Sequence, residues 1–179
     1  TIEAINSGKK VVGIKGGFKA LFEGQKDIFM PLTIDDVSRI HASGGSILRT
    51  SRDKPENAKA KFKTLMSTLK GAGIKYLITI GGDGTLYMAN WIEREARGSV
   101  SVVHTPKTID NDLMETDHCP GYGSVARFAA ITTQEAALDT KAMKNVDPVK
   151  IIELMGRNSG WIVAASALLK RSPEDASHI

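Results

Sequence analysis

The chain has 179 residues, of which 41% are hydrophobic and 25% are charged, and its formal net charge is +4. This composition is typical of a globular domain. The sequence contains no basic block that would suggest a nucleic-acid partner, and no run of about 20 apolar residues that would suggest a membrane span. Cys119 is the only cysteine, so no intrachain disulfide can form, which fits a reducing compartment such as the cytoplasm.

Short apolar runs alternate along the chain with helical patterns, and glycines or polar turns separate them. This alternation predicts an α/β fold, with a Rossmann-like, mostly parallel sheet covered by helices on both faces, in a single domain over residues 1–179. Thr33, with Asp36 three residues later, should cap the first long helix. In chain order we expect a strand at 11–14, a helix at 34–42, a strand-like run at 46–48, a helix from 55 to about 71, a strand at 76–80, a helix to about 97, a strand at 100–103, a helix at 123–145, a strand at 149–154 and a helix at 161–169.

Polar loops follow several of the expected strands, at 49–52, 81–85, 106–112 and 155–160. In an open parallel sheet the loops after the strands meet at one edge, and ligands bind there. The block Gly-Gly-Asp-Gly-Thr at 81–85 stands between a strand and a helix, which suits a phosphate group because glycines allow a close backbone approach. Asp83 cannot face phosphate alone, and we interpret it as a ligand to Mg²⁺.

The loop 108–112 reads Thr-Ile-Asp-Asn-Asp. If it is extended, Asp110 and Asp112 point the same way, so that one carboxylate can accept a proton and the other can orient a metal-bound water. The alternative is an ordinary turn sequence rich in Thr, Asp and Asn. Arg157 and Arg52 also have two interpretations: a charge that neutralises a phosphoryl group, or a surface arginine that caps a loop.

Together these motifs resemble the 6-phosphofructokinase family across nearly the whole chain. The glycine block alone is shared with NAD kinases and diacylglycerol-type lipid kinases, whereas the Thr-Ile-Asp-Asn-Asp block with a later Met-Gly-Arg is much more specific. The matching segments are 44–48 with 50–52, 81–85, 106–112 and 155–157.

The resemblance implies phosphoryl transfer to fructose 6-phosphate, giving fructose 1,6-bisphosphate, in glycolysis. It implies that Asp110 is the general base for the sugar 1-hydroxyl, that Thr108 and Arg157 stabilise the transferring group, and that Asp83 serves Mg²⁺. The residues implied for the phosphoryl donor are Arg52, Gly82, Asp83, Gly84, Thr85 and Lys107. Those implied for the sugar phosphate are Thr108, Asp110, Asp112, Met155, Gly156 and Arg157.

Two residues bear on which donor is used. A glycine where Gly84 stands leaves room for a nucleotide, whereas pyrophosphate-dependent members usually carry aspartate there. Lys107 points the other way, since pyrophosphate enzymes have lysine at that position. We favour ATP, because a side chain in the path of the nucleotide excludes it while a flexible lysine can move aside. Pyrophosphate is the alternative, followed by an NAD or lipid kinase, or a non-enzymatic nucleotide-binding module.

The chain also departs from the family pattern. It starts after the first strand and glycine-rich loop of the family, and ends before its second half, so we expect a fragment that is inactive alone. Pro148 stands where bacterial ATP enzymes carry an arginine that reaches a neighbouring subunit's sugar phosphate, and Lys150 is the candidate substitute. Family members assemble as dimers or tetramers, which implies self-association of the full-length protein.

Overall fold

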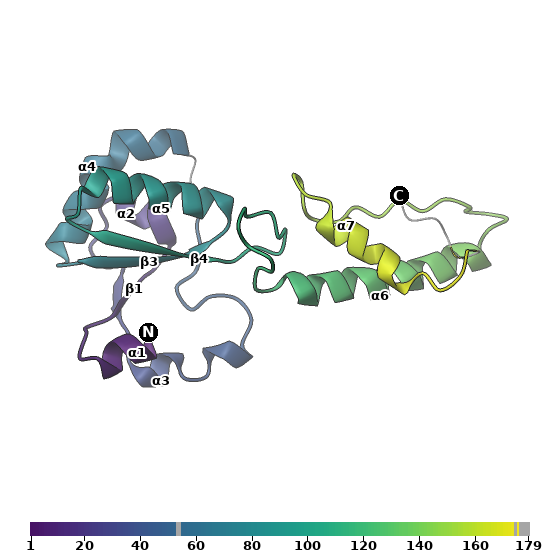
Figure 1. Cartoon of the computed structure of the whole chain (residues 1–179), viewed down its shortest axis with the longest axis horizontal. Coiled ribbons are helices and arrows are strands. Elements are labelled where there is room, and N and C mark those ends of the chain that lie inside the picture. The colour runs from purple at the N-terminus through teal and green to yellow at the C-terminus, as the bar shows by residue number, and fades with distance from the viewer. Residues whose placement is uncertain (53–54, 174, 176–179) are drawn as a thin grey trace. The chain divides into compact units, whose positions relative to one another are not determined.

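The computed structural model describes residues 1–52, 55–173 and 175. They group into two compact units. The first contains residues 1–77 and 87–103, and the second contains residues 78–86 and the chain from His104 onward. Figure 1 shows the elements by label, and each unit is described below by itself.

The first unit begins with α1 (Ile2–Asn6), followed by β1 (Val12–Ile14) and α2 (Gly17–Phe22). β1 pairs antiparallel with β2 (Phe29–Pro31), an additional strand that the sequence patterns do not indicate. The expected helix at 34–42 is interrupted, because only α3 (Ile34–Val37) and the 3-10 turn η1 (Ile40–Ala42) form. The predicted cap at Thr33 is confirmed, since its hydroxyl accepts from the Asp36 N–H at 3.3 Å and its own N–H donates to Asp36 at 2.8 Å.

The strand expected at 46–48 is wrong, because this stretch forms a turn. The Ser46 carbonyl accepts from the Arg49 N–H at 3.1 Å, and the Ser46 hydroxyl accepts from the Leu48 N–H at 3.3 Å. These local bonds use the backbone groups that a ladder would need. Arg49 then adopts a positive φ of 61°, which turns the chain again.

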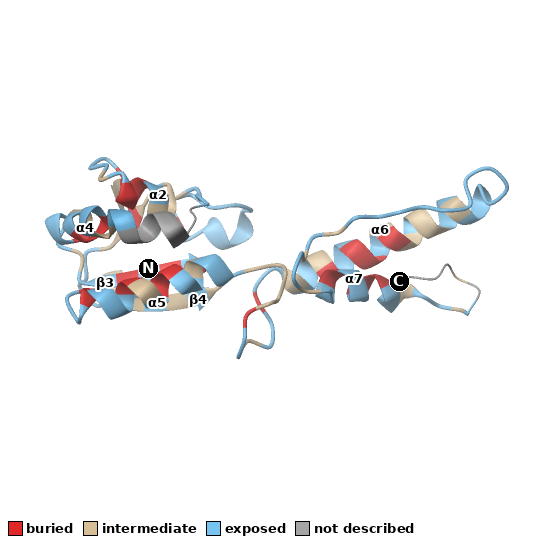
Figure 2. Cartoon of the chain, turned by 90° about the horizontal axis from the view of Figure 1, so that it is seen from above, coloured by how far each residue is buried: buried red, intermediate tan, exposed pale blue. Residues whose placement is uncertain are grey.

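The core of the first unit lies among α2, α4 (Pro55–Gly71), α5 (Asp83–Ala96) and the start of β3 (Tyr76–Gly81). Phe62 of α4 packs edge-on against Trp91 of α5, with ring centroids 4.8 Å apart. Each fully buried Leu or Ile contributes roughly 1.5–3 kcal/mol. The buried positions appear red in Figure 2, and the most completely buried among them are Leu21, Leu65, Leu69, Ile92 and Val100.

β3 and β4 (Ser101–Pro106) form a parallel pair, whose residues are divided between the two units. The Ser101 N–H donates to the Lys75 carbonyl at 2.9 Å and the Lys107 N–H donates to the Gly81 carbonyl at 2.8 Å, so both strands run the same way. Residues on β3 alternate between buried and exposed, with Leu77 and Thr79 buried. Both strands therefore end at the same edge, where the glycine block and the loop after Pro106 begin.

In the second unit, α6 (Tyr122–Ala142) packs against α7 (Trp161–Ala165) and the 3-10 turn η2 (Ser166–Leu169). Small side chains allow the close approach of these helices. The Gln134 side-chain amide also donates to the Leu169 carbonyl at 3.3 Å. The buried residues at this interface are Ala126, Ala129, Ala130, Thr133, Ile162, Ala165 and Ser166.

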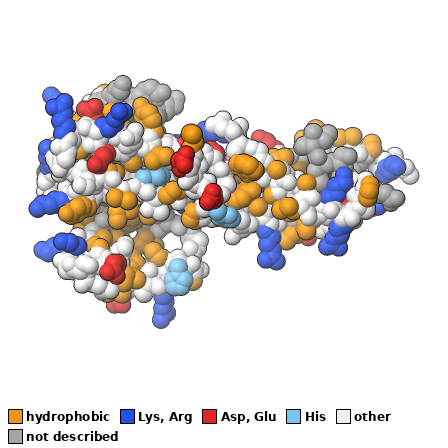
Figure 3. Space-filling model, in the orientation of Figure 1, with side chains coloured by type: hydrophobic (Ala, Val, Ile, Leu, Met, Phe, Trp, Pro, Cys, Tyr) orange, Lys and Arg blue, Asp and Glu red, His pale blue; other side chains and the backbone are white. Residues whose placement is uncertain are grey.

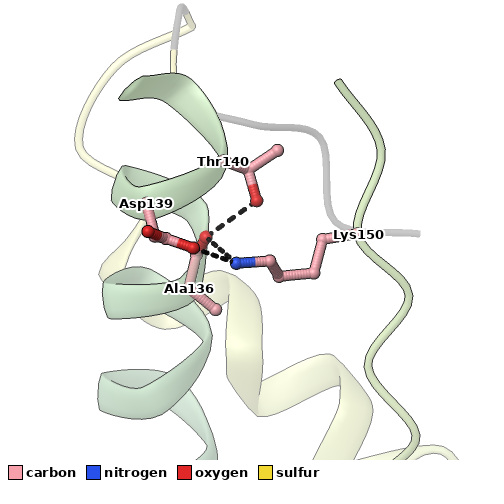
Figure 4. Close-up of polar contacts among 4 residues, drawn as sticks. All are labelled: Ala136, Asp139, Thr140 and Lys150. Atoms are coloured by element: carbon pink, nitrogen blue, oxygen red, sulfur yellow. Dashed lines mark hydrogen bonds and ion pairs between the residues drawn. The ribbon is translucent and has the colours of Figure 1, made fainter. Parts of the chain in front are cut away.

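The strand expected at 149–154 is wrong: this stretch is irregular, and Ile151 is 91% exposed. Lys150 ties it to α6 instead, since its ammonium group pairs with the Asp139 carboxylate and donates to the Ala136 carbonyl at 3.5 Å (Figure 4). Lys150, the candidate for a sugar-phosphate contact, is thus engaged with a helix of its own chain.

None of the helices described is long and apolar enough to cross a membrane. On the face shown in Figure 3, the described Lys and Arg side chains stand at separate places among apolar and neutral groups. The mild net charge is therefore spread out on this face rather than gathered in one patch.

Candidate active site

The glycine block joins the end of β3 to the start of α5. A side chain at Gly81 would collide with Thr85, so only glycine allows the turn to close this tightly. The Leu86 N–H donates to the Gly82 carbonyl at 2.9 Å, which starts the helix. Gly84 differs from its neighbours, because a Cβ built there would meet no atom within 4 Å. The first turn of α5 therefore has open space beside Gly84.

The loop after β4 lies against this block, as predicted from the shared edge. The Lys107 N–H donates to the Gly81 carbonyl at 2.8 Å. A Cβ on Gly82 would be 3.5 Å from the Cβ of Thr108, so these positions are neighbours. Lys107 and Asp83 are both exposed.

Asp110 lies in the middle of this loop with one side-chain oxygen, Oδ1, buried and without a hydrogen-bond partner among the described residues. Its backbone N–H donates to the Thr108 hydroxyl at 3.1 Å. Buried polar atoms normally have partners, so an unpaired carboxylate oxygen here requires an explanation. No donor among the described residues therefore competes for this oxygen, which is shielded from solvent in this structure.

Asn111 shapes the other half of the loop. Its φ is +51°, so the stretch from Asp110 to Asp112 is not extended, and the alternation that would align the two carboxylates does not apply. The Asn111 side chain accepts from the Cys119 N–H at 2.8 Å and donates to the Asp117 carbonyl at 3.3 Å. Asp112 lines a shallow pocket with Asn111 and the segment that follows, whereas Asp110 does not.

The loop 155–160 approaches Asp110 from a distant part of the sequence. The Ser159 hydroxyl donates to the Asp110 carbonyl at 2.7 Å. Gly156 turns this loop with a φ of 112°, and the Ser159 N–H donates back to the Gly156 carbonyl at 2.9 Å. Ser159 carries no motif of its own, and its place between Gly156 and Gly160 is the one sequence signal that could have singled it out.

Arg157, on the same turn, brings a positive charge beside the glycine block. Its Nη2 lies 3.9 Å from Oδ2 of Asp83, and both side chains are mostly exposed, at 73% and 61%. An exposed pair at this distance contributes at most about 1 kcal/mol. Its significance is positional, since the guanidinium group lies beside the residue predicted to serve a metal.

Most of the predicted site residues belong to the second unit: Gly82, Asp83, Gly84, Thr85, Lys107, Thr108, Asp110, Asp112, Met155, Gly156 and Arg157. Arg52 lies in the first unit. It is exposed and follows Ser51, which lines a groove together with the basic side chains of Lys15, Lys19 and Arg49.

His104 of β4 lies just before the second loop. Its Nδ1 is 2.9 Å from the Thr79 hydroxyl, and its buried Nε2 has no partner that meets hydrogen-bond geometry within the described part of the chain. Burial lowers the pKa of His104, and the nearby Gly81 backbone opposes this only in part. This shift favours the neutral form of the imidazole.

The described residues contain no group of three or more His, Cys, Asp or Glu side chains placed to hold a metal ion. Mg²⁺ commonly takes one or two carboxylates and completes its shell with phosphate oxygens and water. The exposed Asp83 carboxylate at the glycine block fits an ion of that kind, one that is shared with phosphate.

Residues 1–176 match the family model described as phosphofructokinase. The chain belongs to the phosphofructokinase family. It is 42% identical over 181 residues to the pyrophosphate–fructose 6-phosphate 1-phosphotransferase of Thermotoga maritima, covering 98% of this chain and 43% of that protein. It is 38% identical over 164 residues to the ATP-dependent 6-phosphofructokinase of Mycobacterium tuberculosis, covering 90% of this chain and 45% of that protein.

Solved structures agree with the α/β fold expected from the sequence. The pyrophosphate-dependent phosphofructokinase from Marinobacter aquaeolei matches with a TM-score of 0.73 and 30% identity, over 95% of this chain and 43% of that one. Phosphofructokinase from Saccharomyces cerevisiae matches with a TM-score of 0.75 at 21% identity, over 92% of this chain and 24% of that one, which supports the fold. The chain thus spans less than half the length of these relatives.

Proposed function

We propose that the full-length protein transfers a phosphoryl group from ATP to the 1-hydroxyl of fructose 6-phosphate in the cytoplasm. The observation that carries this proposal is the buried Oδ1 of Asp110, which has no hydrogen-bond partner in the described residues and lies in a loop held beside both the glycine block and Arg157. Phosphoryl transfer needs positioning, charge neutralisation and a base for the acceptor. The described residues offer a group for each of these needs.

In this mechanism Asp110 accepts the proton of the attacking hydroxyl, since its free oxygen has no competing donor among the described residues. Arg157 and the Thr108 hydroxyl stabilise the charge on the group in transit. The glycine block cradles the donor phosphates through its backbone N–H groups. Mg²⁺ bound through Asp83 would neutralise part of the phosphate charge.

The choice of ATP is supported by the open space beside Gly84, because a glycine there leaves room for a nucleotide. A specific observation also favours a second candidate, pyrophosphate. Lys107 stands where the resemblance places lysine in pyrophosphate enzymes, and the Thermotoga maritima relative, which is 42% identical, is named for pyrophosphate.

A donor-swap assay separates these candidates. The full-length protein is incubated with fructose 6-phosphate and Mg²⁺, and with either ATP or pyrophosphate, and formation of fructose 1,6-bisphosphate is measured. We expect turnover with ATP and none with pyrophosphate. Turnover with pyrophosphate alone refutes the donor assignment. No turnover with either donor, but phosphorylation of NAD or a lipid in a panel of acceptors, refutes the acceptor assignment.

A further inference from the structure

One hydrogen bond links the loop that carries Asp110 to a segment 49 residues away. The Ser159 hydroxyl donates to the Asp110 carbonyl at 2.7 Å, in a partly buried setting. The other side-chain bonds of residues 108–112 are local, because the partners of Asp110 N–H and Asn111 lie within eight residues. Among the described residues, Ser159 is therefore the distant side chain that holds this loop in place.

The position of Ser159 is itself fixed by the turn that it closes. Its N–H donates to the Gly156 carbonyl at 2.9 Å, and Gly156 holds a φ of 112° that side chains rarely adopt. Arg157 lies inside the same turn, with its guanidinium 3.9 Å from Asp83. The Ser159 hydroxyl thus connects the turn that presents Arg157 to the backbone that presents Asp110.

We propose that Ser159 is a positioning residue for the transfer reaction, because its hydroxyl holds the Asp110 loop and the Arg157 turn in register. This inference rests on the proposed function, because Ser159 is assigned no contact with substrate and acts only by positioning the groups that carry out that reaction. Losing the bond leaves the Asp110 carbonyl without its distant donor and frees the loop to shift. A displacement of about 1 Å in a positioned group can cost about 10²-fold in rate.

The test compares three variants of the full-length protein. Ser159→Ala removes the hydroxyl, and Ser159→Thr keeps it. Ser166→Ala is the matched control, because the buried Ser166 hydroxyl also donates to a carbonyl, that of Val163 at 2.6 Å, but within one helical turn away from the Asp110 loop. Steady-state kcat and the KM for fructose 6-phosphate are measured, together with thermal denaturation.

We expect Ser159→Ala to lower kcat at least about 10-fold while the KM changes less than about threefold, because an interaction needed for geometry is lost. Ser159→Thr should recover most of kcat, and Ser166→Ala should retain the kcat of the unsubstituted protein. The proposal is overturned if Ser159→Ala turns over normally, if Ser159→Thr is as slow as Ser159→Ala, or if Ser166→Ala loses the same turnover. An unsubstituted protein that phosphorylates fructose 6-phosphate with neither donor instead contradicts the proposed function.

Discussion

Gly156 sets the geometry of the turn that carries Arg157 and Ser159. Its φ is 112°, and a Cβ built there would lie 2.7 Å from the Ser159 carbonyl oxygen, closer than real Cβ atoms approach. Because that oxygen belongs to the backbone, it cannot swing aside as the end of a flexible side chain can. Gly156→Ala therefore forces the turn either to bear the strain or to rearrange.

The size of the effect follows from these two features. A residue held in a sparsely populated backbone region costs roughly 1–3 kcal/mol, and the close contact adds to that cost. We expect a loss of about 2 kcal/mol in stability, or a shift of the turn that avoids it. A shift of the turn displaces Arg157 and Ser159, so in that case kcat with fructose 6-phosphate should fall at least about 10-fold.

Gly160→Ala is the matched control in the same loop. Gly160 has a φ of −97°, which any residue adopts, and nothing lies within 4 Å of a Cβ built there. Thermal denaturation and steady-state kinetics of the two full-length variants are compared with the unsubstituted protein. The reasoning is refuted if Gly156→Ala matches Gly160→Ala in both stability and kcat.

Three further predictions concern other parts of the site. Asp110→Ser should lower turnover at least about 10²-fold with fructose 6-phosphate binding retained, as expected for loss of a general base. A near-normal rate of phosphoryl transfer in a single-turnover assay would contradict this role. Gly84→Asp should leave the melting temperature unchanged, since the position is open, but should lower activity with ATP at least about 10-fold, because the new side chain fills the space left for the nucleotide and its charge opposes the donor phosphates; unchanged kinetics with ATP would contradict this argument. The pKa of His104 is lowered by burial, so the unfolded chain binds the proton more readily and stability falls as pH drops below about 6.5. His104→Gln should weaken this dependence in urea denaturation at pH 5.5 and 7.5, and an identical dependence in both proteins would count against it.

Local rules predicted the parts of the fold whose partners lie close in sequence. The cap formed by Thr33 and Asp36 appears as expected, because all of its atoms belong to one turn. The strand expected at 76–80 forms as Tyr76–Gly81 and the helix after it also appears, since the apolar run and the glycines act within the same short stretch. The extra strand at 29–31 was missed because a three-residue element with Pro31 at its end has almost no pattern of its own.

The errors fall where an apolar run depends on distant partners. The run at 149–154 is as apolar as a buried strand, yet Ile151 is exposed and Lys150 is bound to α6. A strand exists only if another strand accepts its backbone hydrogen bonds, and the run itself does not specify that partner. The same reasoning applies to 46–48, where local bonds of Ser46 close a turn.

The sequence by itself determined the family and the residue types of the candidate site, because Asp83, Asp110 and Arg157 stand in short motifs whose order and spacing can be recognised along the chain. Only the tertiary structure decided which polar atoms of the site have hydrogen-bond partners and which residues supply them. Oδ1 of Asp110 is buried with no partner in the part of the chain that the structure describes, and a bond across 49 residues makes Ser159 part of the same assembly. Both facts arise from groups that meet only after folding, so spacing along the chain could not reveal them.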